Sequence, residues 1–417
     1  MVVRPEATVE QPRKHRPDYW LIVIVAFLVA IGLTVVYAIS PALSATHGNS
    51  GSNYVSRQVI AIVLSIVAFI VTSRIPLRLW QKWQMPLLIL AAVGTLIALV
   101  TPVIPEYPAH RWIRFGGMSI QSVEALKFAL IIWLAAFLAA RIKAGTVADS
   151  KVTLHPLLIV LAVIGIVVAG VQSDLGSTGV ILVIMAAMAF VAGMPMKRIF
   201  GIGIGILLIL VLAISITPYR RDRLFAFLNP EAHCLTTGYQ ACQALTATGS
   251  GGLVGQGLGG GASSYGYLPE AQNDSIFAIY AEKFGFLGVA VLLGLFMTLF
   301  ARLRLIIERA PDDFSRLVVT GILAWLSTQA IINIGAMIGL LPLKGITLPF
   351  ISYGGTSVLF VGAALGLVFQ ISHYTSFSAR TAHVGSQKAN RRGAGYENTD
   401  DRRRFRRAYH PDSGSRS

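Results

Sequence analysis

The stretch Tyr267–Asp274, with the sequence YLPEAQND, places two carboxylates beside a rigid proline turn at the edge of an apolar segment. A carboxylate held at such an edge can act as a general base, which takes a proton from a reacting hydroxyl group. Aspartate is also a favoured helix N-cap, and Asp274 directly precedes the apolar segment that starts at Ser275. The spacing leaves a chemical role and a capping role equally open for Asp274, and Glu270 shares its motif.

Glu124 and Lys127 form a second candidate group, because residues three positions apart on a helix share a face and can pair. They follow Gln121 in the lead-in to another apolar segment. Ionisable groups near the membrane interior are costly and commonly face a cavity or a partner, so the pair predicts a binding site. The alternative is a structural ion pair that holds two helices together.

Arg111 and Arg114 flank Trp112 in the sequence HRWIRFGG. Guanidinium groups suit phosphate, and a tryptophan ring suits the face of a sugar or the lipid headgroup zone. An aromatic belt with arginines that extend toward the membrane surface is the alternative.

Other polar residues interrupt the apolar segments. Asp174 predicts a helix cap, a polar group in a cavity, or both. Lys344 could reach a phosphate or be an ordinary interfacial lysine, and Ser352 lies in a stretch whose Gly, Pro and Ser content suits a tight turn or re-entrant backbone. Gln329 and Asn333, four positions apart, predict either a cavity or hydrogen bonds between helices.

Composition identifies the elements that must position these groups. The chain has 417 residues, of which 54% are hydrophobic and 13% charged, and its mean hydropathy is +0.66. These values are typical of a polytopic membrane protein and not of a water-soluble domain. The net charge of +16 comes from basic residues in short loops and in the C-terminal tail, a pattern that indicates topology and calls for no nucleic acid.

Apolar runs of membrane-spanning length predict an all-α fold of about ten transmembrane helices. The first run is longer than the core of a cleavable signal peptide and predicts a signal anchor. A link at 74–84 is expected to lie at the membrane interface. The predicted spans are 20–40, 58–73, 85–102, 120–140, 155–171, 175–193, 200–217, 275–300, 317–341 and 352–372.

The basic loops predict the orientation, because Lys and Arg are enriched on the cytoplasmic side. Pro41–Tyr54, on the opposite side, carries no charged residue. We therefore expect both termini in the cytoplasm and the long loop 218–274, with Asp274 at its end, outside the cell. The predicted parts are a cytoplasmic tail 1–18, a transmembrane domain 19–373, and a basic disordered tail 374–417 able to touch anionic lipid or a partner. The basic residues of the cytoplasmic loops are Arg74, Arg78, Lys82, Arg141, Lys143, Lys151, Lys197, Arg198, Arg302, Arg304, Arg309 and Arg316.

The long loop contains a glycine-dense stretch, Gly249–Gly261, which would let its backbone approach a ligand or a bilayer closely. It is no nucleotide-binding fingerprint, because no strand precedes it. The two cysteines, Cys234 and Cys242, lie in the same loop. Eight residues of continuous helix would separate them by ~12 Å, so a disulfide requires a turn between them, and two separate thiols are the alternative.

These motifs resemble the SEDS family of shape, elongation, division and sporulation proteins, and the division-type members more than the elongation-type ones. Three departures, Ser122-Val123, Ser173 and Gln272-Asn273, stand where the family usually has Pro-Ser, Pro and His-Thr, and they leave the class intact. The matching residues are Arg111-Trp112-Ile113, Gln121 with Glu124 and Lys127, Asp174-Leu175-Gly176, Tyr239-Gln240 with Gln243, Gly255–Gly259, Tyr267–Ala271 with Asp274, and Leu348–Gly355.

The resemblance implies a peptidoglycan glycosyltransferase of the bacterial plasma membrane that polymerises lipid II, the lipid-linked disaccharide-pentapeptide, at the outer membrane face during division. Its implied partners are a class B penicillin-binding protein, which cross-links the strands, and other divisome proteins. Asp274 matches the family's essential aspartate and would be the general base, with Glu270 in support. Cations would stabilise the departing pyrophosphate, and a divalent ion, Mg²⁺ or Mn²⁺, could assist them. The cationic candidates are Arg111, Arg114, Lys127 and Lys344.

Three other functions stay open: a lipid II flippase, an elongation-type polymerase, and a scaffold whose loop recruits partners. A transporter is expected to carry ionisable groups across the midplane to the cytoplasmic side. The candidate groups gather instead toward the outer face, which favours an external enzyme.

Overall fold

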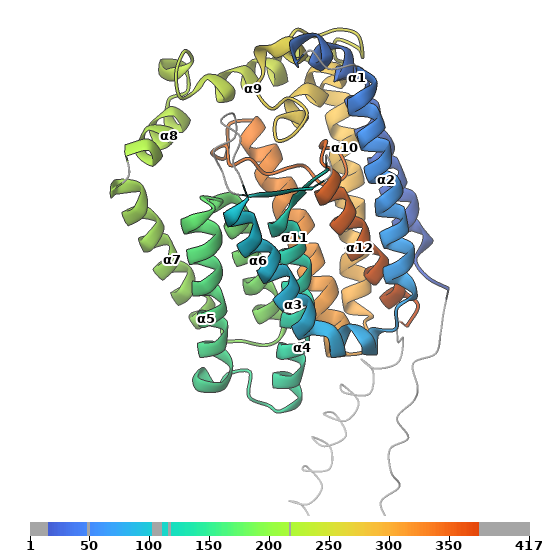
Figure 1. The fold of residues 1–417 in the computed structure, drawn as a ribbon, viewed down its shortest axis with the longest axis vertical. Helices are drawn as coiled ribbons and strands as arrows, with labels where there is room; N and C mark the ends of the chain where they lie inside the picture. The colour runs from blue at the N-terminus through green and yellow to red at the C-terminus, as the bar shows by residue number, and fades with distance from the viewer. Residues whose placement is uncertain (1–15, 48–50, 102–110, 116–117, 217, 375–417) are drawn as a thin grey trace, which may run out of the picture.

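Hydrogen bonding in the bilayer determines the architecture, because only helices and closed barrels satisfy their backbone groups without water. A computed structural model describes residues 16–47, 51–101, 111–115, 118–216 and 218–374. Each predicted span corresponds to a helix in a bundle that is capped at one end by two shorter helices, α8 (Pro218–Leu228) and α9 (Tyr239–Ser250) (Figure 1). The bundle helices are α1 (Tyr19–His47), α2 (Gly51–Arg74), α3 (Leu77–Val100), α4 (Ser122–Lys143), α5 (His155–Ile164), α6 (Leu175–Val191), α7 (Met196–Ile216), α10 (Ile276–Glu308), α11 (Asp313–Met337) and α12 (Gly355–Ser372).

The prediction of an all-helical polytopic membrane protein is confirmed. Among the described residues, eight helices are long and apolar enough to cross a membrane, and Leu175–Val191 is a shorter apolar helix. One of the eight is the span Ser150–Val171, in which π-helical turns extend α5 at both ends. The predicted tails lie almost entirely outside the described residues.

Two local features go beyond what the sequence predicted. The expected interfacial link 74–84 is largely helical, because α3 begins at Leu77 and buries Trp80 against Phe128, with ring centroids 5.8 Å apart. Between α3 and α4 the chain forms an antiparallel hairpin of β1 (Trp112–Phe115) and β2 (Met118–Gln121). In this hairpin Trp112 pairs with Gln121.

The centre of the bundle is made by α4, α11 and α12. In each of these helices 67% of the most apolar stretch is buried, whereas in α2, α3 and the Ser150–Val171 span the share is 17%. The outer helices therefore present their apolar side chains to the surroundings, as lipid requires. The start of α1 and the end of α12 lie together, because the backbone N–H of Asp18 donates to Ser372 Oγ at 3.2 Å.

A disulfide joins Cys234 to Cys242, so the bonded alternative is the one observed. A short 3-10 turn precedes Cys234, and α9 begins only at Tyr239, so the intervening residues are not a continuous helix. The two Cα atoms are therefore 5.6 Å apart, within the range that a disulfide spans.

Close packing joins α2 to α12 through hydroxyl groups and glycines. Ser65 Oγ donates to the carbonyl of Val358 at 2.8 Å, and Thr72 Oγ1 donates to the carbonyl of Ala363 at 2.8 Å. A Cβ atom at Gly366 would lie 2.1 Å from Thr72 Oγ1 and 2.3 Å from a backbone oxygen of α2. Small residues at helix crossings in membranes allow this approach.

We expect Gly366→Ala to lower the free energy of unfolding by about 1–3 kcal/mol, the usual cost of overpacking. Gly203→Ala is the matched control, because a Cβ there meets nothing within 4 Å, and its helix α7 should be unchanged or slightly stabilised. Thermal unfolding of both purified variants in the same detergent checks this. Equal midpoints for the two variants would contradict the close α2–α12 contact.

Candidate active site

Asp274 lies where α9, α11 and the segment 341–354 meet, just before α10 begins. We call this end of the bundle the Asp274 end. A hollow at this end, which we call the Asp274 hollow, has a volume of about 170 Å³, including the open space at its mouth. It is lined by Asp274, Ile332, Asn333, Ala336, Met337, Leu343, Lys344, Gly345 and Ile346.

Asn333 holds the backbone of Asp274. Its Nδ2 donates to the carbonyl of Asp274 at 2.7 Å and to the carbonyl of Ile346 at 2.7 Å. One buried amide on α11 therefore holds two of the segments that line the hollow. Of the two predicted alternatives for Asn333, the cavity is the one observed, because its hydrogen bonds go to two loop carbonyls and not to a second helix.

Ser352 and Tyr353 hold the residues just before Asp274. Ser352 is buried, and its Oγ donates to the carbonyl of Asn273 at 2.7 Å while accepting from the N–H of Leu348 at 2.7 Å. The N–H of Tyr353 donates to the carbonyl of Gln272 at 2.9 Å. Ser352 thus stabilises the tight turn that the Gly, Pro and Ser content of this stretch predicted. This turn holds the chain beside the Asp274 carboxylate.

The side chain of Asp274 is not a helix cap, so that prediction is wrong. Helix α10 begins at Ile276, its N-cap is Ser275, and no side chain caps its first turn. Gln240 from α9 donates instead to Asp274 Oδ1 at 3.5 Å and to Ser275 Oγ at 3.1 Å. Gly345, with φ +67°, brings its backbone against the carboxylate, and a Cβ there would lie 3.7 Å from Oδ2.

The surroundings of Asp274 raise the pKa of its carboxyl group toward neutral pH. Burial and, second, the negative charge of Glu270 raise its pKa from 3.8 to about 7, against the opposing effect of hydrogen bonds from backbone groups and Gln240. The Glu270 carboxylate accepts from the Asn273 side chain, and Glu270 itself has φ +52° in the turn. Glu270 thus lies in the same turn as Asp274 and contributes to the raised pKa of its carboxyl group, and a supporting role in the reaction stays a prediction.

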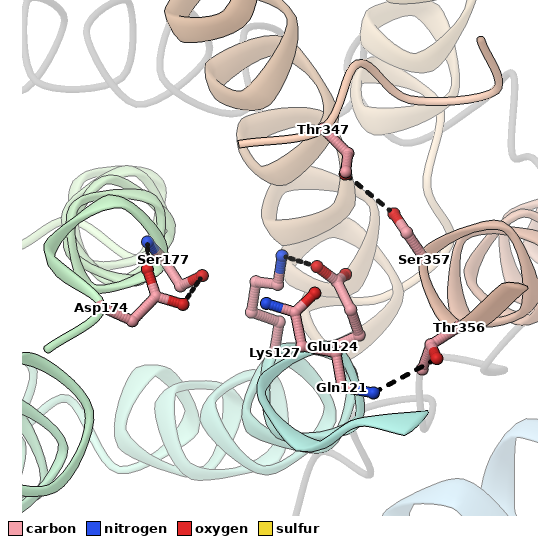
Figure 2. Close-up of polar contacts among 8 residues, drawn as sticks. All are labelled: Gln121, Glu124, Lys127, Asp174, Ser177, Thr347, Thr356 and Ser357. Atoms are coloured by element: carbon pink, nitrogen blue, oxygen red, sulfur yellow. Dashed lines mark hydrogen bonds and ion pairs between the residues drawn. The ribbon is translucent and has the colours of Figure 1, made fainter. Parts of the chain in front are cut away.

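A second polar group lies at the starts of α4, α6 and α12 (Figure 2). Lys127 Nζ lies 2.7 Å from Glu124 Oε1, and both side chains are almost fully buried. Lys127 also lies 5.0 Å from the centroid of the Trp325 ring, while Glu124 Oε2 has no hydrogen-bond partner among the described residues. The expected ion pair is present, and the unpartnered oxygen leaves it one free acceptor position.

Asp174 and Arg111 build the turn that enters α6. Asp174 caps the helix, since it accepts from the Ser177 N–H at 3.0 Å and from Ser177 Oγ at 2.8 Å. Arg111 donates to the carbonyl of Gln172 at 3.2 Å and to that of Ser173, which has φ +53°, at 2.7 Å. These contacts give Arg111 a role in supporting the backbone.

The remaining predicted residues belong to the hairpin. The Gln121 N–H donates to Thr356 Oγ1 at 3.2 Å, and the carbonyl of Trp112 accepts from Thr101 Oγ1 at 3.0 Å. Arg114 lies in β1, but its side chain is outside the described part of the structure. The structure thus brings Asp274, Glu270, Ser352 and Lys344 into one group and sets the other candidates around the helix starts.

Gln240 is the functional residue that sequence reasoning missed, because it appeared only as part of a motif. No short spacing connects it to Asp274, which lies 34 positions away. The described residues contain no group of three His, Cys, Asp or Glu side chains placed to hold a metal. Since Mg²⁺ often binds one or two carboxylates together with substrate phosphates, Asp274 and Glu270 fit only a site of that shared kind.

Comparisons with known proteins agree with this architecture. A family model described as "Cell cycle protein", covering FtsW, RodA and SpoVE, matches residues 19–377. The chain is 37% identical over 363 residues to the "Probable peptidoglycan glycosyltransferase FtsW" of Coxiella burnetii, covering 86% of this chain and 96% of that protein. It is 34% identical over 372 residues to the stage V sporulation protein E of Bacillus subtilis, covering 88% and 99%.

Solved structures share the fold. One is a chain of a peptidoglycan synthase complex that coordinates polymerization and crosslinking, with a TM-score of 0.71, 27% identity, and coverage of 86% of this chain and 99% of that one. The rod shape-determining protein RodA of Thermus thermophilus gives a TM-score of 0.60 at 24% identity, covering 86% and 98%, and shows the fold alone.

Fold and site define a multi-pass membrane protein with a carboxylate site at one end of its helical bundle. The family match covers nearly all the described residues, from the first helix to the end of the last. The chain belongs to the SEDS family of FtsW, RodA and SpoVE proteins.

The two neighbours of Asp274 predict opposite pKa shifts. Glu270→Gln removes a negative charge and should lower the pKa of Asp274 below about 7, whereas Gln240→Leu removes a donor and should raise it. Lys344, the other charged group at the hollow, stays unchanged in both variants. Infrared titration of the protonated carboxyl band, with Asp274→Asn as the blank, measures these shifts. Shifts in the same direction would contradict the assigned causes.

Proposed function

We propose that the chain is a peptidoglycan glycosyltransferase that polymerises lipid II into glycan strands during cell division. The observation that carries this proposal is Asp274, a partly buried carboxylate with a pKa of about 7 that is held in the Asp274 hollow beside Lys344. A general base works best when its pKa lies near the operating pH. The relatives named as FtsW support both the chemistry and the division role.

The proposed reaction is a transfer between two sugars. The acceptor sugar hydroxyl attacks the anomeric carbon of the donor, a new C–O bond forms, and the bond to the lipid pyrophosphate breaks with its electron pair. Asp274 takes the hydroxyl proton as attack proceeds. Lys344, which lines the hollow, is the cation proposed to stabilise the pyrophosphate that leaves.

Arg111, Arg114 and Lys127 stay candidates for binding substrate phosphate. Arg111 and Lys127 already have protein partners, the carbonyls before α6 and the Glu124 carboxylate, and would have to share their charge with the substrate. A divalent cation, if bound, would supply further charge stabilisation between the carboxylates and the phosphates.

The proposed orientation places the Asp274 end outside the plasma membrane and both termini in the cytoplasm. The basic residues of the loops at the opposite end support it. The proposed partners are a class B penicillin-binding protein and other division proteins. The similarity to a chain of a complex that coordinates polymerization and crosslinking supports a transpeptidase partner.

Asp274→Asn should abolish polymerisation of purified lipid II, a loss of at least about 10²-fold, because an amide cannot accept the proton. Asp312→Asn is the matched control: Asp312 caps α11 by accepting from the Ser315 N–H at 2.8 Å, at the opposite end of the bundle. That variant keeps an acceptor oxygen and should retain normal activity. Gel analysis of the glycan products, with the partner present, measures both variants.

Glycan strands made by a well-folded Asp274→Asn variant at the wild-type rate would rule out Asp274 as the base. Movement of lipid II across vesicles without polymerisation would instead support the flippase function. The thermal midpoint of each variant separates loss of chemistry from loss of folding.

A further inference from the structure

Helix α10 is interrupted near the Asp274 end. Gly285 has φ +63° and ψ −166°, which no helix contains, so two helical pieces meet there. The first piece, residues 276–284, is buried almost throughout and begins two residues after Asp274. A break of this kind removes the normal partners of several backbone groups, which must then find others inside the protein.

The glycine-rich loop 251–261 supplies these partners on both sides of the break. The N–H groups of Gln256 and Gly257 donate to the carbonyls of Glu282 at 2.9 Å and Lys283 at 3.0 Å. In return, the carbonyls of Gly252 and Leu253 accept from the N–H groups of residues 286 at 2.9 Å and 287 at 3.0 Å. The loop therefore completes the hydrogen bonding that the broken helix lacks.

Two adjacent charged side chains hold this loop and Ser263, which lies two residues after its end. Lys283 Nζ donates to the carbonyls of Leu258 at 2.8 Å and Gly260 at 3.0 Å. Glu282 Oε1 accepts from Ser263 Oγ at 2.9 Å and from the Ser263 N–H at 3.4 Å. Both charged residues are only 3% exposed. Burying two charges is costly unless hydrogen bonds offset the loss of hydration. Loss of the loop contacts would leave both charges buried without these hydrogen bonds, so the contacts keep the loop in place.

Gly255 and Gly261 are required by this contact, whereas a close approach of the loop to a ligand or a bilayer stays a prediction. A Cβ at Gly255 would lie 2.2 Å from the carbonyl oxygen of Lys283, and one at Gly261 would lie 2.5 Å from the Glu282 carboxyl carbon. Both glycines also have positive φ, +83° and +88°. A flexible glycine chain loses much entropy when it is ordered, so it needs strong fastening.

The loop connects directly to the candidate base. Helix α9 immediately precedes it and carries Gln240, which donates to Asp274 and Ser275. The first piece of α10 immediately follows Asp274. Gln240, which contacts the carboxylate, and the chain that leads from Asp274 into α10 therefore belong to elements whose far ends are joined by the loop and its two charged side chains.

We propose that Glu282 and Lys283 are positioning residues for the transfer reaction, which act by fastening the glycine loop 251–261 into the α10 break and so fixing the Asp274 carboxylate. This inference rests on the proposed function of Asp274. The two residues touch no substrate. They determine where α9 and the start of α10 lie, and a misplacement of about 1 Å at a reacting group can cost roughly 10²-fold in rate.

The test compares kcat and KM for lipid II in the full-length protein with its partner. Gly261→Ala and Glu282→Ala should each lower kcat by about 10²-fold and leave KM within about a factor of two. Glu282→Gln should restore most of kcat, because its amide oxygen still accepts from Ser263. Gly259→Ala, whose Cβ meets nothing within 4 Å, and Glu308→Gln, from an exposed pair at the opposite end of α10, are the matched controls.

Hydrogen exchange of the same proteins shows whether the loop has opened. Faster exchange in 251–263 and 270–280 of Gly261→Ala, together with the fall in kcat, supports the inference. Unchanged kcat despite faster exchange would overturn it. A fall in activity that only follows the folded fraction in thermal unfolding, with Glu282→Gln no better than Glu282→Ala, would also overturn it.

Asp274→Asn, assayed in parallel, separates the two proposals. If it is inactive while Gly261→Ala and Glu282→Ala keep full kcat, the positioning role fails and the proposed function stands. If it is active, the proposed function fails and the positioning role fails with it.

Discussion

Backbone groups inside a membrane protein must find hydrogen-bond partners within the protein, and the Asp274 end depends on this constraint. A continuous α10 would satisfy its own backbone and would need no glycine loop. The break at Gly285 lets the loop 251–261 pack against the helix backbone. Four backbone hydrogen bonds join the loop to the two pieces of the helix, two of them donated by the loop and two accepted by it. The helix start, α9 and the carboxylate between them are thereby parts of one hydrogen-bonded unit.

The polar groups at this end divide into those that support the backbone and those left for chemistry. Three side chains donate hydrogen bonds to backbone carbonyl groups, namely Asn333, Ser352 and Arg111. Among the side-chain donors of the described residues, Asp274 has a long contact to Gln240 alone, and it lines the same hollow as Lys344. This division favours Asp274 as the group that reacts, because its neighbours fix its place without neutralising it.

Sequence patterns predicted the ten helices because apolar length is a local property. They also singled out Asp274, Glu124 and Lys127 as candidate site residues, because charge is conspicuous in an apolar chain. They did not predict the role of Gln240, the α10 break, or the use of the glycines, since each depends on contacts between distant segments. The capping role of Asp274 was wrong for a related reason: Ser275 occupies the cap position, and no side chain caps the helix.

The pH dependence of glycan polymerisation by the wild-type protein tests the central claim most directly. If Asp274 must be ionised to accept the proton, kcat should rise through a half-maximal point near the pKa of about 7 that burial and Glu270 produce. A rate that is constant from about pH 5 to about pH 8, or that falls only near the ordinary carboxylate pKa of roughly 4, would contradict Asp274 as the base.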